Sequence, residues 1–310
     1  MTYQEIFNEY ARIPKPNGKW DIFRRVASAF RRFVLKKRVL FYFSYNKTDG
    51  ENIIKADNVI ISLTSFPARL NTIWQCIESL KRQSILPEKI VLYLSKDQIS
   101  QKDLPFSLIK EEDELFEIRM VDGDIKSHKK YYYAMKEYQG KIIVTTDDDV
   151  IYPPFMLSNL LEAHSKYPVD VIANCTHVIK QNNGIVSPYI EWYDIPATQN
   201  KIDSTLNQIQ VGIGGVLYPP NILYKDVFNM NLARELSFLA DDLWLYTQTV
   251  MGGHRVVKSK LNRNTIIPIT IENDRTLTNE NVLQNKNDIQ FNNLRHYYLD
   301  KFDIDIVKII

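Results

Sequence analysis

The sequence predicts an α/β fold with a mainly parallel sheet flanked by helices and a basic helical extension at the N-terminus. Between Asn58 and Ile179, short apolar runs alternate with segments of helical apolar spacing, and this alternation is typical of βαβ units. Hydrophobic residues make up 45% of the 310 residues and charged residues 25%, which is an ordinary globular composition. The stretch from Phe23 to Lys47 differs, because it contains no acidic residue and eight basic ones.

The expected elements follow from these periodicities. Strands are predicted at Val59–Leu63, Lys89–Leu94, Phe116–Val121, Lys141–Thr146 and Val169–Ile179. Helices are predicted at Thr72–Arg82, Ser127–Tyr138, from Pro153 to about Tyr167, around Leu239–Met251 and at Asn281–Phe302. Pro153 and Pro154 are expected in the first turn of their helix, where proline is favoured.

The first 55 residues are predicted to form a basic amphipathic extension, and residues 56–310 one catalytic domain. On a helix, Phe23, Val26, Ala27, Phe30, Phe33 and Val34 share one face, and most of the basic residues point away from it. Three interpretations remain open: a helix packed on its own domain, an interfacial helix on an anionic membrane surface, and a nucleic-acid site. Because the net charge of the chain is only +2, nucleic acid is not expected as a partner.

Cysteine usage and the absence of long apolar stretches bear on location. Cys76 and Cys175 are far apart in apolar contexts, which favours buried, reduced thiols in a cytosolic compartment over a disulfide. The first residues lack the basic-then-apolar order of a signal peptide. We expect a cytoplasmic protein that is not an integral membrane protein. Its basic extension could attach it to the inner face of the cytoplasmic membrane.

Three adjacent carboxylates form the most informative motif. Asp147, Asp148 and Asp149 follow directly after the apolar run of the fourth predicted strand. Adjacent carboxylates repel one another, and Mg²⁺ or Mn²⁺ bound to a diphosphate would offset that repulsion. In extended backbone, Asp147 and Asp149 project to the same side. A metal-bound nucleotide ligand is therefore expected here, with a solvated acidic turn as the alternative.

Two later segments carry further candidate residues. Gln210–Pro220 has three glycines within four residues, which suits either close backbone approach to a ligand or an ordinary turn. Asp241 and Asp242 stand where the helix around Leu239–Met251 begins. Two carboxylates there could complement the helix dipole, or one of them could remove a proton from an attacking hydroxyl.

The acidic triplet resembles the DXD motif of GT-A glycosyltransferases. Residues 59–69, 77–87 and 89–94 look like the first strand, nucleotide loop, helix and second strand of bacterial surface-polysaccharide glycosyltransferases of the capsule and O-antigen type. The resemblance runs from about Asn58 to Arg255. It implies a GT-A-like, Rossmann-like sheet and a divalent cation as cofactor, Mn²⁺ or Mg²⁺.

The resemblance also implies roles for single residues. Asp149 would bind the metal, Asp147 the ribose or the metal's water shell, and Asp148 would be the ambiguous middle member on the nucleotide side. Asp242 would be the catalytic base and Asp241 its acceptor-binding partner, with interchangeable roles. The other implied nucleotide contacts are Thr64, Ser65, Pro67, Arg69, and Lys129 or Lys130. His254 would complete the metal shell, or else be structural.

The expected function is transfer of a sugar, with inversion, from a nucleotide sugar to a hydroxyl of a glycan or lipid-linked glycan in cell-surface polysaccharide synthesis. UDP as the nucleotide is implied by the resemblance alone. A retaining glycosyltransferase and a sugar-1-phosphate nucleotidylyltransferase are the alternatives. The second should carry a glycine-rich loop after the first strand, whereas residues 64–69 contain no glycine.

Overall fold

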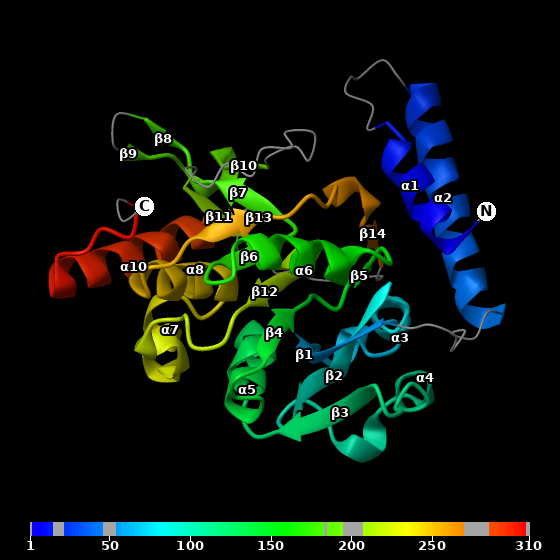
Figure 1. Cartoon of the computed structure of the whole chain (residues 1–310), viewed down its shortest axis with the longest axis horizontal. Coiled ribbons are helices and arrows are strands. Elements are labelled where there is room, and N and C mark those ends of the chain that lie inside the picture. Colours follow the sequence, from blue (N-terminus) through cyan, green and yellow to red (C-terminus); the bar gives the residue numbers. More distant parts are fainter. Residues whose placement is uncertain are drawn as a thin grey trace.

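The computed structural model of the protein describes residues 2–14, 22–45, 54–182, 185–194, 207–269 and 285–307. A seven-stranded sheet forms its centre, in the order β13-β6-β12-β4-β1-β2-β3 (Figure 1). Its strands are β1 (Ile54–Thr64), β2 (Ile85–Ser95), β3 (Phe116–Val121), β4 (Ile142–Thr145), β6 (Val171–Ala173), β12 (Val216–Tyr218) and β13 (Val256–Lys258).

Most neighbouring strands in this sheet are parallel. β1 pairs in parallel with both β2 and β4, β2 with β3, and β13 with β6. Only β12 runs antiparallel to its neighbours, β4 and β6. The expected mainly parallel α/β sheet is therefore confirmed.

Helices bury both faces of the sheet. On one face, Val59, Ile61 and Leu63 join a core cluster with α3 and α6, whereas Ile60 packs on the opposite face with Ala134 of α5. This alternation follows from the two-residue period of a strand. The helices after β1 are α3 (Trp74–Leu80), α4 (Phe106–Ile109), α5 (Lys129–Glu137), α6 (Met156–Lys166), α7 (Met230–Leu236), α8 (Asp241–Met251) and α10 (Lys286–Phe302).

The predicted strand Val169–Ile179 is wrong as a single element. β6 belongs to the large sheet, whereas β7 (Thr176–Val178) lies between β10 (Tyr193–Asp194) and β11 (Gln208–Gln210) in a small antiparallel sheet. Between them, the Asn174 amide donates hydrogen bonds to the carbonyls of Met156 and Gly214. The chain therefore changes sheets within the segment that was predicted as one strand.

Two predicted helices begin later than expected. Pro153 and Pro154 precede α6 instead of lying in its first turn, and their carbonyls accept hydrogen bonds from the side chain of Gln83 and the N–H of Ser84. α10 covers the part of Asn281–Phe302 from Lys286 onward, and residues 281–284 lie outside the described ranges. The remaining short strands are β5 (Val150–Ile151), β8 (Gln181–Asn182), β9 (Ile185–Val186) and β14 (Ile267–Pro268).

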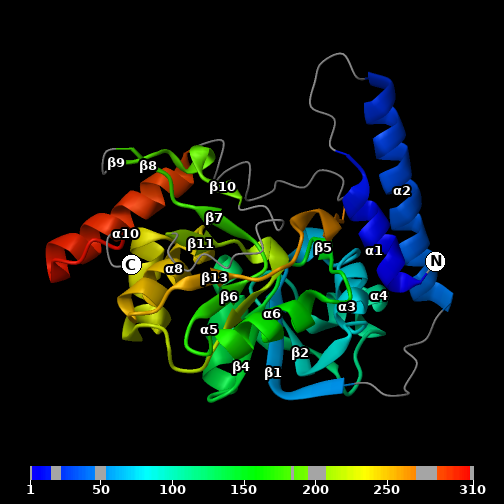
Figure 2. The ribbon, with the colours of Figure 1, turned by 45° about the horizontal axis from the view of Figure 1, so that its top comes forward.

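The N-terminal residues form two packed helices, α1 (Tyr3–Arg12) and α2 (Ile22–Tyr45). Thr2 caps α1 in a reciprocal capping box with Glu5. Both views place α2 on the outside of the pair, at one end of the molecule (Figures 1 and 2). Among the described residues, no helix combines the length and apolarity that crossing a bilayer requires. Cys76 and Cys175 are buried and form no disulfide.

Candidate active site

A cavity of about 600 Å³ lies at the carboxyl ends of β1 and β4. These strands are parallel and Ser62 pairs with Thr145, so the loops that follow them meet at the same edge of the sheet. Ligands bind at this edge in open α/β sheets. The cavity is lined by the acidic triplet, by Thr64, Ser65 and Arg69, by both Lys129 and Lys130, and by Asp241 and Asp242.

The loop after β1 holds the buried member of the triplet. Arg69 ends the short 3₁₀ helix Pro67–Arg69, and its guanidinium pairs with Asp148 at 2.5 Å and with Asp149 at 3.1 Å. The hydroxyl of Ser65 donates to the other oxygen of Asp148. Burial raises the pKa of Asp148 against the opposing charge of Arg69. Asp148 therefore joins the two loops.

Asp147 and Asp149 are more open to the cavity than Asp148 is. Their side chains are each 31% exposed, against 7% for Asp148. Burial, and after it the charge of Asp147, raises the pKa of Asp149 to about 6. Asp149 thus shares Arg69 with Asp148, whereas Asp147 pairs with Lys130.

Lys130 joins the acidic triplet to the second carboxylate pair. Its ammonium group lies 2.9 Å from Asp147 and 3.0 Å from Asp241, although 17 and 111 residues separate them in sequence. Burial alone would lower the pKa of Lys130, but the charges of Asp147 and Asp241 raise it well above its usual value. The resemblance implied a phosphate contact for this lysine; the structure places it between carboxylates.

The second pair stands at the first two residues of α8. Burial raises the pKa of Asp241, but the charge of Lys130 outweighs this effect and holds the pKa below its usual value. For Asp242, burial and then the charge of Asp241 raise the pKa to about 8. Environment therefore separates two adjacent aspartates into one ionised carboxylate and one that holds a proton near neutral pH.

The glycine cluster packs against both carboxylate groups. The N–H of Gly212 donates to Asp242 at 3.1 Å, and a Cβ at Gly212 would lie 3.0 Å from an oxygen of Asp147. Gly215 has φ +85°, which side chains rarely tolerate. The close approach of Gly212 explains why this loop needs glycine.

Other predicted site residues have different surroundings. Lys129 pairs with Asp124 at 2.6 Å, while Pro67 does not line the cavity. His254 follows α8 beyond Gly252 and Gly253 and does not line the cavity either. The backbone N–H of His254 donates to the carbonyl of Thr249.

Several lining residues were not identified from the sequence. Asp124 also accepts hydrogen bonds from Lys126 and Gln98. Burial raises the pKa of Asp124, but its hydrogen bonds from Lys126 and Lys129 outweigh burial and lower that pKa to about 2. Arg263 lines the cavity from the 3₁₀ helix Arg263–Thr265. Asp124 lies in the same charged segment as Lys129 and Lys130, and this proximity in sequence could have identified it. No sequence pattern surrounds Arg263.

The donor set of the cavity fits a hard divalent cation. Asp147 and Asp149 offer carboxylate oxygens at the cavity, which six aspartates line together with five lysine and arginine side chains. Within the described ranges, no three His, Cys, Asp or Glu side chains form a complete metal site. Mg²⁺-type sites commonly use only one or two carboxylates and take their other oxygens from water and phosphate.

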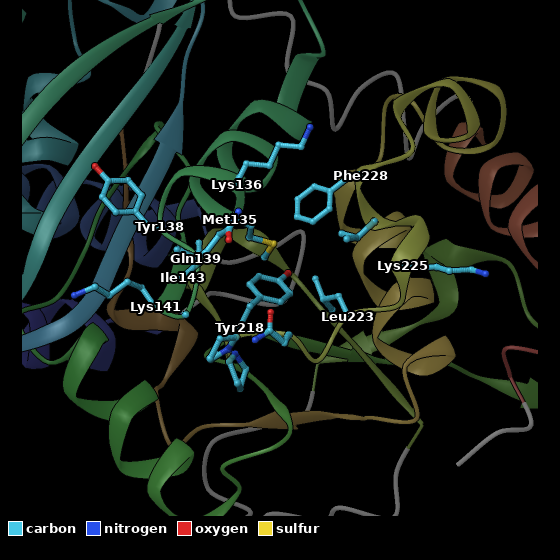
Figure 3. Close-up of a pocket in the computed structure, with 15 residues that line it drawn as sticks. Met135, Lys136, Tyr138, Gln139, Lys141, Ile143, Tyr218, Leu223, Lys225 and Phe228 are labelled. Carbon is cyan, nitrogen blue, oxygen red and sulfur yellow. The ribbon is translucent and has the colours of Figure 1, made fainter.

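A second cavity, of about 380 Å³, lies near the opposite end of β4 and is lined by Met135, Tyr218, Leu223 and Phe228 (Figure 3). Three lysines also line it, but the ammonium ends of Lys141 and Lys225 point away from its centre. Lys141 pairs with Glu88 instead. The charged groups do not converge, so this cavity lacks the features of an anion site.

Residues 65–225, just over half of the chain, match the family model described as "Glycosyl transferase family 2". No curated protein sequence matches the chain. The solved structures that are similar to this chain include three of low identity. A mannosyltransferase from Pyrobaculum calidifontis, in complex with GDP-mannose and Mn²⁺, is 14% identical over 83% of this chain and 66% of that one, with a TM-score of 0.41.

Glucosyl-3-phosphoglycerate synthase from Mycobacterium tuberculosis, in complex with Mn²⁺, UDP and phosphoglyceric acid, is 16% identical over 40% of this chain and 43% of that one, with a TM-score of 0.28. A 4-diphosphocytidyl-2C-methyl-D-erythritol synthase from Anaerococcus prevotii is 15% identical over 77% and 99%, with a TM-score of 0.41. The chain spans about two thirds of the mannosyltransferase and less than half of the glucosyl-phosphoglycerate synthase. At these values the structural similarities support no statement about substrate.

Proposed function

This chain belongs to glycosyl transferase family 2, and on that premise we propose that it transfers a sugar from a nucleotide sugar, with UDP as the nucleotide, to an acceptor hydroxyl. The acceptor is a glycan or lipid-linked glycan of cell-surface polysaccharide synthesis in a bacterial cell. The reaction inverts the anomeric centre and depends on Mn²⁺ or Mg²⁺. It takes place in the cytoplasm or on the inner face of the cytoplasmic membrane.

One observation carries the proposal: two chemically different carboxylate groups face one cavity and share Lys130. Asp147 and Asp149 are partly exposed at the end of β4, and Asp242, also partly exposed, lies at the start of α8 beside the buried Asp241. Glycosyl transfer needs both kinds of group, one to hold the charged donor and one to activate the acceptor. The arrangement supports these two roles in a single site.

On the donor side, Asp147 and Asp149 would hold the cation. When bound, it would neutralise charge on the donor diphosphate and on the departing nucleotide. Thr64, Ser65 and Arg69 line the same part of the cavity, and in the proposal they orient the nucleoside. Asp148 keeps the two loops together through its pairs with Ser65 and Arg69.

On the acceptor side, Asp242 would accept the hydroxyl proton as the oxygen attacks the anomeric carbon. A base works best when its pKa lies near the operating pH, and burial with the charge of Asp241 brings the pKa of Asp242 to about 8. The N–H of Gly212 fixes one of its oxygens. Asp241, ionised beside Lys130, would bind another acceptor hydroxyl.

Membership of the family favours sugar transfer over nucleotidyl transfer, since residues 65–225 match a glycosyltransferase model. A panel of nucleotide sugars, tested with and without Mn²⁺ by thermal shift and then by nucleotide release with glycan acceptors, examines the proposal. We expect a Mn²⁺-dependent rise in melting temperature with one UDP-sugar and UDP release when acceptor is added. Formation of a nucleotide sugar from a nucleoside triphosphate and a sugar 1-phosphate would contradict it.

A further inference from the structure

The helix α2 has two apolar faces, and only one of them packs on the protein. Leu35, Val39 and Phe43 recur every four residues and are buried against the core. Arg32 and Lys36 also turn inward: Arg32 donates to the carbonyl of Ile13, and Lys36 donates to that of Pro268. This face accounts for how the helix is held.

The second apolar face lies on the opposite side of α2 and is exposed. Phe23 is 92% exposed and Phe30 is 65% exposed. Together with Val26, Phe33 and Phe41, these side chains form what we call the outer stripe, with a spacing of three to four residues or its multiples. Soluble proteins seldom expose a contiguous apolar patch that has no function.

Positive charge accompanies the outer stripe. No acidic residue occurs within α2, and Arg24, Arg25, Arg31, Lys37 and Arg38 are exposed along it. The structure pairs Arg31 with Glu9 of α1, at a separation of 3.4 Å. An exposed apolar stripe beside arginine and lysine, on a helix too polar to cross a bilayer, is the pattern of a helix that lies in a membrane interface.

We propose that α2 binds an anionic lipid bilayer through the outer stripe, with its axis along the membrane plane. At 1.5 Å per residue, 24 residues give about 36 Å of contact. Phenylalanine side chains enter the headgroup region while arginine and lysine meet lipid phosphates. A second copy of the chain fits this face less well, because it would oppose one cationic helix to another.

The attachment also orients the candidate active site. Lys36 binds the carbonyl of Pro268 in β14, and β14 pairs with β5, which directly follows the acidic triplet. The N–H of Ile269 then donates to the carbonyl of Asp149 at 2.7 Å. α1 packs on the segment Arg263–Thr265, from which Arg263 lines the cavity.

A membrane bound to α2 would therefore lie on the same side of the molecule as β14, which connects α2 to Asp149. This orientation favours a lipid-linked acceptor. Only this statement about the acceptor rests on the proposed function. The attachment itself does not depend on the reaction.

Vesicle co-sedimentation of the full chain, without donor or acceptor, tests the attachment. We expect binding to vesicles of phosphatidylcholine with phosphatidylglycerol, weaker binding at 0.5 M salt, and little binding to phosphatidylcholine alone. The double variant Phe23→Ser/Phe30→Ser should bind about 100-fold more weakly. Each of Arg25→Gln and Lys37→Gln should cost about fivefold.

Phe106→Ser serves as the matched control, because Phe106 is 79% exposed on α4, outside the outer stripe. It should bind vesicles like the unchanged protein. Since Phe23 and Phe30 are exposed, their variants should keep the far-UV circular dichroism spectrum and the activity on a water-soluble acceptor. Equal recovery with neutral vesicles, or unchanged binding by the double variant, would overturn the proposal. The proposal would also be overturned if light scattering showed the unchanged protein to be a dimer and the double variant a monomer, while neither of the two bound vesicles.

Discussion

The two carboxylate groups of the cavity contain the same residue type on different backbone elements. The acidic triplet follows a strand, and its outer members remain partly exposed beside Arg69. Asp241 and Asp242 begin a helix, and Asp241 is buried whereas Asp242 is partly exposed. Burial and a neighbouring carboxylate raise the pKa of Asp149 to about 6 and that of Asp242 to about 8. Two partly exposed aspartates of one cavity thus differ in pKa, and the one with the higher pKa suits proton transfer near neutral pH.

The largest effect on nucleotide binding is expected at the acidic triplet. Asp149→Ala should weaken Mn²⁺-dependent UDP binding by more than about 100-fold, since even partners outside the ligand shell change metal affinity 10–100-fold. The backbone hydrogen bond from Ile269 to residue 149 survives the change, so the fold should persist. Isothermal calorimetry measures the affinity, and Asp122→Ala, an exposed carboxylate, is the control. Affinity that neither EDTA nor Asp149→Ala alters would refute the metal assignment.

Lys130 lies between the acidic triplet and the Asp241–Asp242 pair, and removing its charge should destabilise the protein. Lys130→Met leaves Asp147 and Asp241 without their shared cation, and breaking a buried pair costs about 3–5 kcal/mol. Urea unfolding at pH 8 measures the loss. Lys136→Met, at an exposed position of the same helix, should change stability by at most about 0.5 kcal/mol. Equal unfolding midpoints for the two variants would mean that the ion pairs of Lys130 do not stabilise the fold.

A smaller effect concerns pH. Because burial and Asp241 raise the pKa of Asp242 to about 8, the basic form is scarce below that pH. kcat/KM should therefore rise about tenfold per pH unit up to about pH 8 and then level off. Initial rates across pH 5–9 with saturating Mn²⁺ check this. A flat profile down to pH 5 would mean that Asp242 is already ionised or is not the base.

The sequence predicted the sheet and the placement of the acidic triplet well. Phe116–Val121 was predicted with the bounds that β3 has, and the triplet follows β4 because its apolar run marks a buried strand. By contrast, the change of sheet at Asn174 lies inside a segment that was predicted as one strand, and a single polar residue there does not indicate a change of sheet. Local periodicity identifies elements but not the sheet to which each belongs.

The candidate site was predictable only in part. Asp241 and Asp242 were identified, but their meeting with Asp147 through Lys130 depends on contacts between residues far apart in sequence. For Lys130, the resemblance implied a phosphate contact, and no local pattern could reveal the carboxylates on both sides. Arg263 enters the cavity from a loop without a motif, and the metal role of His254 stays a prediction.

Paired measurements on Asp242→Asn test the central claim most directly. Asparagine keeps the size of the side chain and can still accept a hydrogen bond from Gly212, but it cannot take up the hydroxyl proton. We predict that kcat falls by about 10²–10⁴-fold while the dissociation constant for UDP-sugar with Mn²⁺ is unchanged. Asp241→Asn should mainly raise KM for the acceptor, and NMR coupling constants of the wild-type product should report inversion. Near-normal turnover of Asp242→Asn, or a product with the donor's anomeric configuration, would contradict the account.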